Sequence, residues 1–137
     1  MPLVIDSSVV AKWILPEEDS LKAVRLTDGS NDPLIVLDLA LIEVANAIFV
    51  RQLRKKITAD EAGRFFEVLS SIQVPMIPSG DLLRRGFGLA LKYRCAVYDA
   101  LFVAVVEKLG CDGVTADEKL YRAVVGDFPK IKLLSAW

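Results

Sequence analysis

Two of the chain's aspartates come soon after short β-branched runs that are typical of buried strands. Asp6 directly follows residues 3–5, and Asp117 follows residues 113–115 after one intervening alanine. If both runs belong to one parallel sheet, the two carboxylates reach its carboxyl edge, where open α/β sheets bind their ligands. Each aspartate also has a purely structural interpretation. Asp6 could cap the helix that follows, and Asp117 could be a first-turn acid, because Thr115 and Glu118 have capping-box spacing.

Two further acids lie within helical patterns that are otherwise apolar. Glu43 has Leu39, Ala40 and Ala47 among its same-face neighbours, so we expect its side chain to be largely buried. A lone buried carboxylate is costly unless a partner or a metal compensates its charge. Asp99 stands in the first turn of an apolar helix, where the helix dipole favours its charge but does not explain its place above an apolar face. The alternative for Glu43 is a narrow polar stripe that faces solvent.

The four acids are more informative as a group than singly. Carboxylates gathered in one crevice repel each other and cannot all stay ionised without a cation. The chain has no histidine, and its two cysteines lack the CxxC spacing of metal or redox motifs. Oxygen ligands alone select Mg²⁺ or Mn²⁺, which can orient a phosphodiester and activate water. Asn46, three residues after Glu43, could orient that glutamate.

Composition bounds the remaining possibilities. The absence of histidine excludes Ser-His-Asp and Cys-His catalysis and HExxH zinc sites. The 137 residues are 53% hydrophobic, so we expect one domain over residues 1–137 that needs no disulfides. We expect a cytoplasmic protein with no membrane contact, because no apolar run spans a bilayer and the N-terminus lacks signal-peptide features. The net charge of −1 does not indicate nucleic-acid binding, which would therefore depend on local basic patches.

Short apolar runs alternate with longer helical stretches along the whole chain. We expect strands at residues 3–5, 34–36, 72–77, 113–115 and 131–134. Pro75 cannot donate a ladder hydrogen bond, so it places the third strand at a sheet edge. This alternation implies right-handed crossovers, and therefore a three-layer α/β/α domain with a parallel sheet of about five strands.

Capping and turn residues indicate where the helices begin and end. We expect them at residues 8–15, 17–27, 39–55, 59 onwards, 81–93, 97–109 and 118–125. Asp38 is the expected N-cap of the third, and Thr58 opens the fourth with capping-box spacing. The turn pair at residues 28–29 ends the second helix, and Gly110 stands where a left-handed C-terminal cap belongs.

Four short motifs carry the acids: VIDSSVV at residues 4–10, IEVANA at 42–47, YDAL at 98–101 and VTAD at 114–117. In this order they resemble the PIN-domain ribonucleases, and most closely the VapC toxins of toxin–antitoxin pairs. Each motif is weak alone, but the four together extend over essentially the whole chain. The likeness is therefore a specific one.

This resemblance implies a PIN-like α/β/α fold and the endonucleolytic cleavage of RNA with Mg²⁺ or Mn²⁺. The RNA is usually a particular structured one, and the products carry a 5′-phosphate and a 3′-hydroxyl. The acidic quartet of the family falls on Asp6, Glu43, Asp99 and Asp117. Ser7 and Thr115 match hydroxyl positions that support the metal site.

Partner surfaces are less sharply marked. RNA could be held by Arg51, Arg54, Lys55 and Lys56, or by Arg84, Arg85, Lys92 and Arg94. Both sets also suit solvated helix ends. The VapC resemblance implies an antitoxin partner, for which residues 13–15 could line a groove. Phe49, Phe65 and Phe66 could belong to a homodimer surface, with core packing as the alternative for all of these apolar residues.

Three other functions are considered. A PIN nuclease could act outside any toxin pair, for example in RNA maturation. A PIN fold could also serve only as a non-catalytic partner of an antitoxin, although the complete quartet argues against this. A phosphoacceptor or phosphatase domain is disfavoured, because Ser7 and Ser8 follow Asp6 where those motifs place a second acid.

Overall fold

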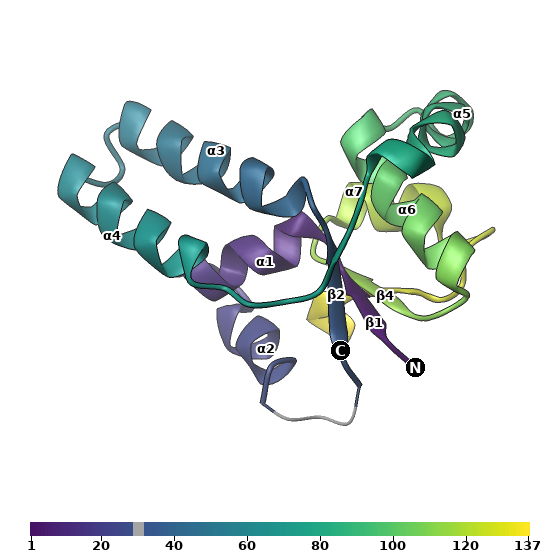
Figure 1. Ribbon diagram of the computed structural model, residues 1–137, viewed down its shortest axis with the longest axis horizontal. Helices are drawn as coiled ribbons and strands as arrows, with labels where there is room; N and C mark the ends of the chain where they lie inside the picture. The colour runs from purple at the N-terminus through teal and green to yellow at the C-terminus, as the bar shows by residue number, and fades with distance from the viewer. Residues whose placement is uncertain (29–31) are drawn as a thin grey trace.

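A five-stranded parallel sheet runs through the middle of the computed structural model, which describes residues 1–28 and 32–137. The strands are β1 (Leu3–Ile5), β2 (Leu34–Leu37), β3 (Met76–Ile77), β4 (Gly113–Thr115) and β5 (Ile131–Leu133). Their order in the sheet is β3-β2-β1-β4-β5, with β1 at the centre (Figure 1). Helices cover both faces, which confirms the predicted α/β/α fold.

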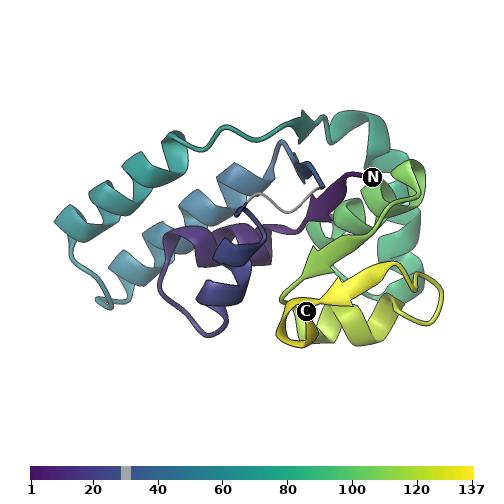
Figure 2. The ribbon, with the colours of Figure 1, turned by 90° about the horizontal axis from the view of Figure 1, so that it is seen from below.

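The helices form two groups around this sheet. They are α1 (Ser7–Ile14), α2 (Ser20–Arg25), α3 (Ala40–Leu53), α4 (Ala59–Ser70), α5 (Leu83–Tyr93), α6 (Val97–Leu109) and α7 (Glu118–Val124), with short 3₁₀ turns at Gly80–Leu82 and Leu134–Ala136. The first four lie on one side and the last three on the other, and α3 and α4 run as an antiparallel pair beyond the sheet (Figure 2). The described part of the chain contains no helix with the length and apolar character to cross a membrane.

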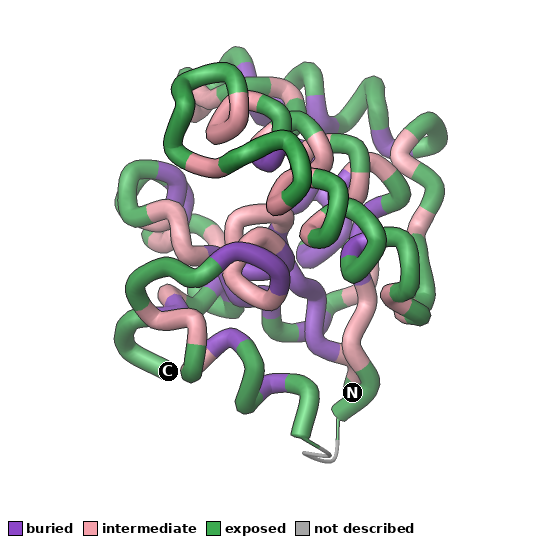
Figure 3. The backbone as a smooth tube through the Cα atoms, turned by 90° about the vertical axis from the view of Figure 1, so that its left-hand side faces the viewer, coloured by how far each residue is buried: buried purple, intermediate pink, exposed green. Residues whose placement is uncertain are grey.

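Apolar side chains from both helix groups make two cores, one on each face of the sheet. Phe102 and Val105 of α6 are fully buried in one core, and Ile5 of β1 with Val9 and Val10 of α1 are buried in the other. Buried segments gather in the middle of the molecule, with exposed turns around them (Figure 3). Burial on both faces explains why the strands are apolar throughout rather than alternating.

The sheet register brings two chain segments together at its carboxyl edge. Val4 of β1 pairs with Ile35 of β2 on one side and with Gly113 of β4 on the other. The backbone N–H of Asp6 donates to the carbonyl of Val114, so the chain leaves β1 beside the end of β4. The residues that follow these two strands are therefore neighbours.

Several predicted boundaries need correction. The third strand covers only Met76–Ile77, because Pro75 lacks the N–H that a longer ladder would need, although it lies at the sheet edge as predicted. The second helix begins at Ser20 instead of residue 17, since the Ser20 hydroxyl accepts from the backbone N–H of Glu17 in the preceding turn. The predicted turn at residues 28–29 falls partly outside the described residues.

The predicted helix caps have mixed outcomes. Asp38 is not the N-cap of α3, because its carboxylate accepts from the backbone N–H of Ser79 and joins the ends of β2 and β3. Thr58 and Glu61 form the predicted capping box of α4. Gly110 ends α6 in the left-handed conformation, with a φ of 63°.

Gly113 lets α6 pack closely on β4, and Gly113→Ala is expected to destabilise the fold by about 1–3 kcal/mol. A Cβ at this position would stand 2.5 Å from Val106 Cγ2 and 3.0 Å from Phe102 Cζ. Chemical denaturation measures the loss. Gly126→Ala is the control, because within the described residues nothing lies within 4 Å of its Cβ position. Equal stability of the two variants would contradict this packing account.

Candidate active site

The carboxyl ends of β1 and β4 and the first turns of α3 and α6 surround a small acidic pocket. Its volume is about 180 Å³, and it is lined by Asp6, Ser7, Ser8, Ala11, Glu43, Val44, Ala47, Asp99 and Asp117. The structure therefore brings all four predicted acids to one place. Two of them follow strands and two open helices, so the fold converges four separate segments on this pocket.

Asp6 is the most buried of the four, with 6% of its surface exposed. Its Oδ2 accepts hydrogen bonds from Ser8 Oγ and Thr115 Oγ1, each 2.7 Å long. Asp6 does stand at the N-cap position of α1, as the structural alternative predicted, but among the described residues its side chain makes no cap hydrogen bond. Burial raises the pKa of Asp6 above its usual value, whereas the Ser8 and Thr115 hydroxyls and the Ser7 backbone oppose that rise.

Asp117 has both a structural and a pocket position. Its Oδ1 accepts from the backbone N–H of Leu120 at 3.0 Å, which makes it the N-cap of α7. Its own backbone N–H donates to Thr115 Oγ1 at 3.1 Å. Asp117 is therefore the cap itself and not a first-turn acid behind a Thr115 cap, and its side chain also lines the acidic pocket.

Glu43 and Asp99 come from helices on opposite sides of the pocket, and both are half-buried. Burial, followed by the charges of Asp6 and Asp99, raises the pKa of Glu43 to about 7, although a hydrogen bond with Ser7 opposes this. Burial, followed by the charges of Asp6 and Asp117, raises the pKa of Asp99 to about 6. The carboxylates thus hinder each other's ionisation, as expected for like charges in one crevice.

These side chains fit a hard divalent cation by their chemistry. The donors are oxygens whose pKa values are raised first by burial and then by like-charge repulsion, and a cation favours their ionised forms. In residues 1–28 and 32–137, no group of three or more acidic or cysteine side chains is already arranged to hold an ion. The acids therefore share a pocket, and ion binding would require their side chains to draw closer together.

All four acids of the pocket lie within the part of the chain that is similar to a known protein family. The PIN-domain family matches residues 3–125. This chain belongs to the PIN-domain family. It is 37% identical over 122 residues to the Ribonuclease VapC3 of Pyrobaculum aerophilum, a match that covers 88% of this chain and 92% of that protein. The predicted resemblance to PIN domains of the VapC type is confirmed.

Two solved structures share the fold. VapC20 of Mycobacterium tuberculosis, a sarcin-ricin loop cleaving toxin, is similar with a TM-score of 0.67 and 17% identity, covering 89% of this chain and 95% of that one. A toxin–antitoxin complex from Klebsiella pneumoniae contains a chain that is similar with a TM-score of 0.65 and 13% identity, covering 96% and 97%. At these identities the likeness concerns the PIN fold.

Asn46 does not belong to the pocket of this PIN domain, contrary to the predicted role of orienting Glu43. It is exposed and lies outside the pocket lining, whereas Ala47 lines it. On a helix, the residues three and four positions after Glu43 lie on opposite sides of it. The pocket lies on the side of Ala47, not on the side of Asn46.

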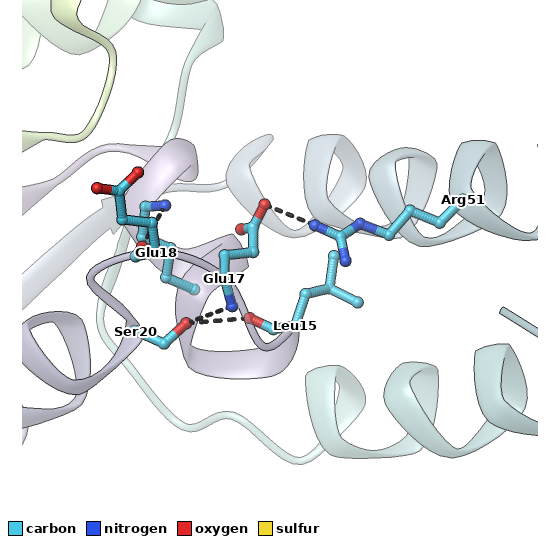
Figure 4. A network of polar contacts seen from close by, with 6 residues as sticks. Leu15, Glu17, Glu18, Ser20 and Arg51 are labelled. Carbon is cyan, nitrogen blue, oxygen red and sulfur yellow. Dashed lines mark hydrogen bonds and ion pairs between the residues drawn. The ribbon is translucent and has the colours of Figure 1, made fainter. Parts of the chain in front are cut away.

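Arg51 is engaged elsewhere in the PIN domain. Its guanidinium donates to Glu17 Oε2 at 2.6 Å, which ties α3 to the turn between α1 and α2 (Figure 4). Ser20 holds the same turn through Leu15 and Glu17. This ion pair gives Arg51 a structural contact, so an RNA phosphate would have to compete with Glu17 for its guanidinium.

Ser8 is the pocket residue that the sequence reasoning missed, because only its neighbour Ser7 was singled out. Ser7 lines the acidic pocket, and the Thr115 hydroxyl donates to Asp6. The available signal for Ser8 was its place in the motif at residues 4–10. Its partners in β4 and the following turn become visible only in the fold.

Metal-free protein is expected to lose stability as the pH rises from 5 to 8. Glu43, Asp99 and Asp6 have raised pKa values, so the folded state binds more protons than the unfolded state in this range. Their stabilising protonation is complete below about pH 4 and is lost as the pH passes 6 and 7. Glu61 and Glu107 have lowered pKa values, which act only at more acid pH.

Thermal unfolding at each pH, with and without Mg²⁺, tests this dependence. The melting temperature in EDTA should fall between pH 5 and 8, and Mg²⁺ should raise it more at pH 8, because a ligand that binds only the folded state stabilises it. A melting temperature in EDTA that rises with pH over this range would contradict the proposed charge repulsion.

Proposed function

We propose that this PIN domain is a Mg²⁺- or Mn²⁺-dependent endoribonuclease and the toxin of a toxin–antitoxin pair. The observation that carries this proposal is the convergence of Asp6, Glu43, Asp99 and Asp117 on one pocket. The name of the VapC3 relative supports ribonuclease activity, and that of VapC20 supports a structured substrate. We infer that residues 1–137 act as one nuclease domain and that it acts in the cytoplasm, with its RNA.

Asp6 and Asp99 would hold the ion most directly. When bound, such an ion neutralises phosphodiester charge and activates the attacking water. Glu43 and Asp117 would hold it through water or hold a second ion, and Glu43 is also suited to accept a proton at its carboxylate. In the metal-free site, burial and then the charges of Asp6 and Asp99 raise the pKa of Glu43 to about 7. A nearby cation would favour its ionised form, which is the form that accepts a proton. The expected products carry a 5′-phosphate and a 3′-hydroxyl.

Basic side chains near the end of α3 are candidates for flanking RNA contacts. Arg54, Lys55 and Lys56 are exposed there, at the C-terminal end of α3, whereas Glu43 lies in its first turn. A helix rises about 1.5 Å per residue, so Arg54 lies roughly 16 Å along α3 from Glu43. They would therefore contact RNA phosphates away from the cleaved bond. Such contacts would strengthen and position RNA binding without taking part in the cleavage step.

A larger apolar pocket suits an antitoxin segment. It has a volume of about 630 Å³ and includes Trp13, Ile14, Val24 and Val68 among its lining residues. Ile14 and Leu15 are both buried in the core, so half-buried Trp13 is the member of residues 13–15 that a partner would contact. The Klebsiella pneumoniae toxin–antitoxin complex supports a partner of this kind.

We also propose a homodimer. Phe49 of α3 and Phe66 of α4 are 55% and 50% exposed, as a partner surface would require. Phe65 packs against the core, so the alternative of core packing holds for it. Size-exclusion chromatography with light scattering tests this assembly, and a monomer at micromolar concentration would count against it.

Cleavage of a structured-RNA pool by purified, antitoxin-free protein tests the function. We expect cutting in Mg²⁺ or Mn²⁺ and none in EDTA, with 5′-phosphate ends that a phosphate-specific ligation detects. Folded protein that binds an antitoxin tightly but cuts no RNA with either ion would favour the non-catalytic binding module. An active enzyme whose gene has no small antitoxin neighbour would favour RNA maturation outside a toxin pair.

A further inference from the structure

Ser8 stands at the junction of the two segments that carry Asp6 and Asp117. Its Oγ donates to Asp6 Oδ2 at 2.7 Å and accepts from the backbone N–H of Ala116 at 2.9 Å. Ser8 belongs to α1, whereas Ala116 follows β4 and precedes Asp117. One hydroxyl therefore connects the first strand's carboxylate to the turn that presents another pocket acid.

Thr115 makes the same kind of connection. Its Oγ1 accepts from the backbone N–H of Asp117 at 3.1 Å and donates to Asp6 Oδ2 at 2.7 Å. A hydroxyl has a single proton. Because each hydroxyl accepts from a backbone N–H, its own proton is directed onward to Asp6. Both hydroxyl protons then point to Asp6. Ser8 Oγ and Thr115 Oγ1 lie 3.3 Å apart, but no proton is left for a hydrogen bond between them.

Two such chains end on a single oxygen of Asp6. Both hydroxyls donate to Oδ2, which leaves Oδ1 without a hydroxyl donor. Asp6 and Thr115 are buried and Ser8 is half-buried, and each buried side-chain polar atom in the described part of the chain has a hydrogen-bond partner. A carboxylate held in this way presents one fixed oxygen to the pocket instead of exchanging its two oxygens.

We propose that Ser8 is a positioning residue that, with Thr115, holds Oδ2 of Asp6 so that Oδ1 faces the ion. Ser8 also keeps the turn with Asp117 in register with Asp6, so one hydroxyl aligns two of the four acids. This inference rests on the proposed metal-dependent ribonuclease. It assigns the orienting role on the Asp6 side chiefly to Ser8, whereas the sequence pointed to Ser7.

Measurements of metal affinity and kcat distinguish a positioning role of Ser8 from a merely structural one. For Ser8→Ala we expect Mn²⁺ affinity, measured by electron paramagnetic resonance without RNA, to fall about 10- to 100-fold. The kcat for RNA cleavage should fall within the same range, while KM changes little. Ser8→Thr keeps the hydroxyl and should restore both values. Ser70→Ala is the matched control, since among the described residues its hydroxyl donates to the Phe66 carbonyl on α4 and lies outside the acidic pocket.

A double-mutant cycle locates the effect on Asp6. If Ser8 and Thr115 act through the same Oδ2, the losses of Ser8→Ala and Thr115→Val should not multiply, because residues in one network are coupled. Independent losses in Mn²⁺ affinity would overturn the shared-oxygen account. Should Ser8→Ala fail to fold, Ser8→Cys keeps the size with a weaker donor and should show the same loss in Mn²⁺ affinity.

The failures of the two proposals are distinguishable. If wild-type protein binds Mn²⁺ and cuts RNA, and a folded Ser8→Ala protein does both equally well, the positioning role is wrong and the ribonuclease stands. If wild-type protein neither binds Mn²⁺ nor cuts RNA, the proposed function fails and this inference fails with it.

Discussion

Asp99→Asn is expected to lower RNA cleavage by about 10³-fold or more while the protein stays folded. The amide keeps the size of the side chain but carries no charge toward an ion. A lost ligand removes several kcal/mol of charge stabilisation, and each 1.4 kcal/mol, roughly, is worth a factor of ten in rate. The fold should tolerate the change, because the replaced carboxylate is repelled by Asp6 and Asp117.

Asp60→Asn is the matched control for this variant. Asp60 stands in the first turn of α4 as Asp99 stands in the first turn of α6, so both substitutions remove a favourable helix-dipole contact. Asp60 is exposed and lies outside the acidic pocket, and its variant should cut RNA at the wild-type rate. Single-turnover cleavage of one defined RNA compares them. Equal rates for the two variants would remove Asp99 from the catalytic set.

Glu43→Gln is expected to have two opposite effects. Cleavage should fall by about 10²-fold or more, because Glu43 would hold the ion or accept a proton, and a positioned proton acceptor is worth at least this factor. The metal-free protein at pH 8 should become more stable, since the ionised Glu43 faces the charges of Asp6 and Asp99. Solvent screening at this half-buried side chain limits the gain to about 1 kcal/mol or less, or about 2–4 °C in Tm.

The control for this variant is Glu67→Gln, an exposed glutamate within α4. Thermal unfolding in EDTA at pH 8 should show a higher melting temperature for Glu43→Gln than for wild type, and an unchanged one for Glu67→Gln. Adding Mg²⁺ should then stabilise wild type more than Glu43→Gln. A lower melting temperature for Glu43→Gln in EDTA would mean that this side chain supports the fold, contrary to the proposed repulsion.

Much of the fold follows from local signals in the sequence. The capping box at Thr58 and the left-handed glycine at Gly110 depend on neighbouring residues alone, and both are found as predicted. The convergence of Asp6 and Asp117 follows from one rule about parallel strands, because β1 and β4 are adjacent in the sheet. Glu43 was recognised because a charge in an apolar helix needs a compensating partner.

The features that could not be predicted from the sequence depend on contacts between segments that lie far apart in the chain. The hydroxyl of Ser8 meets the backbone of Ala116 only because β1 and β4 end side by side. Asp38 has the residue type of a helix cap, but the close end of β3 offers its carboxylate the Ser79 backbone instead. Arg51 resembled a free basic residue until the turn after α1 placed Glu17 beside it. Local propensity gave way to tertiary contacts in each case.

Mn²⁺ occupancy and the cleavage rate, followed in one titration of wild-type and Asp6→Asn protein, test the central claim most directly. Electron paramagnetic resonance reports bound Mn²⁺, and single-turnover cleavage of a structured RNA reports chemistry in the same samples. The account predicts that the wild-type rate follows Mn²⁺ occupancy and that Asp6→Asn loses both. RNA cleavage that persists in EDTA or in folded Asp6→Asn protein would contradict it.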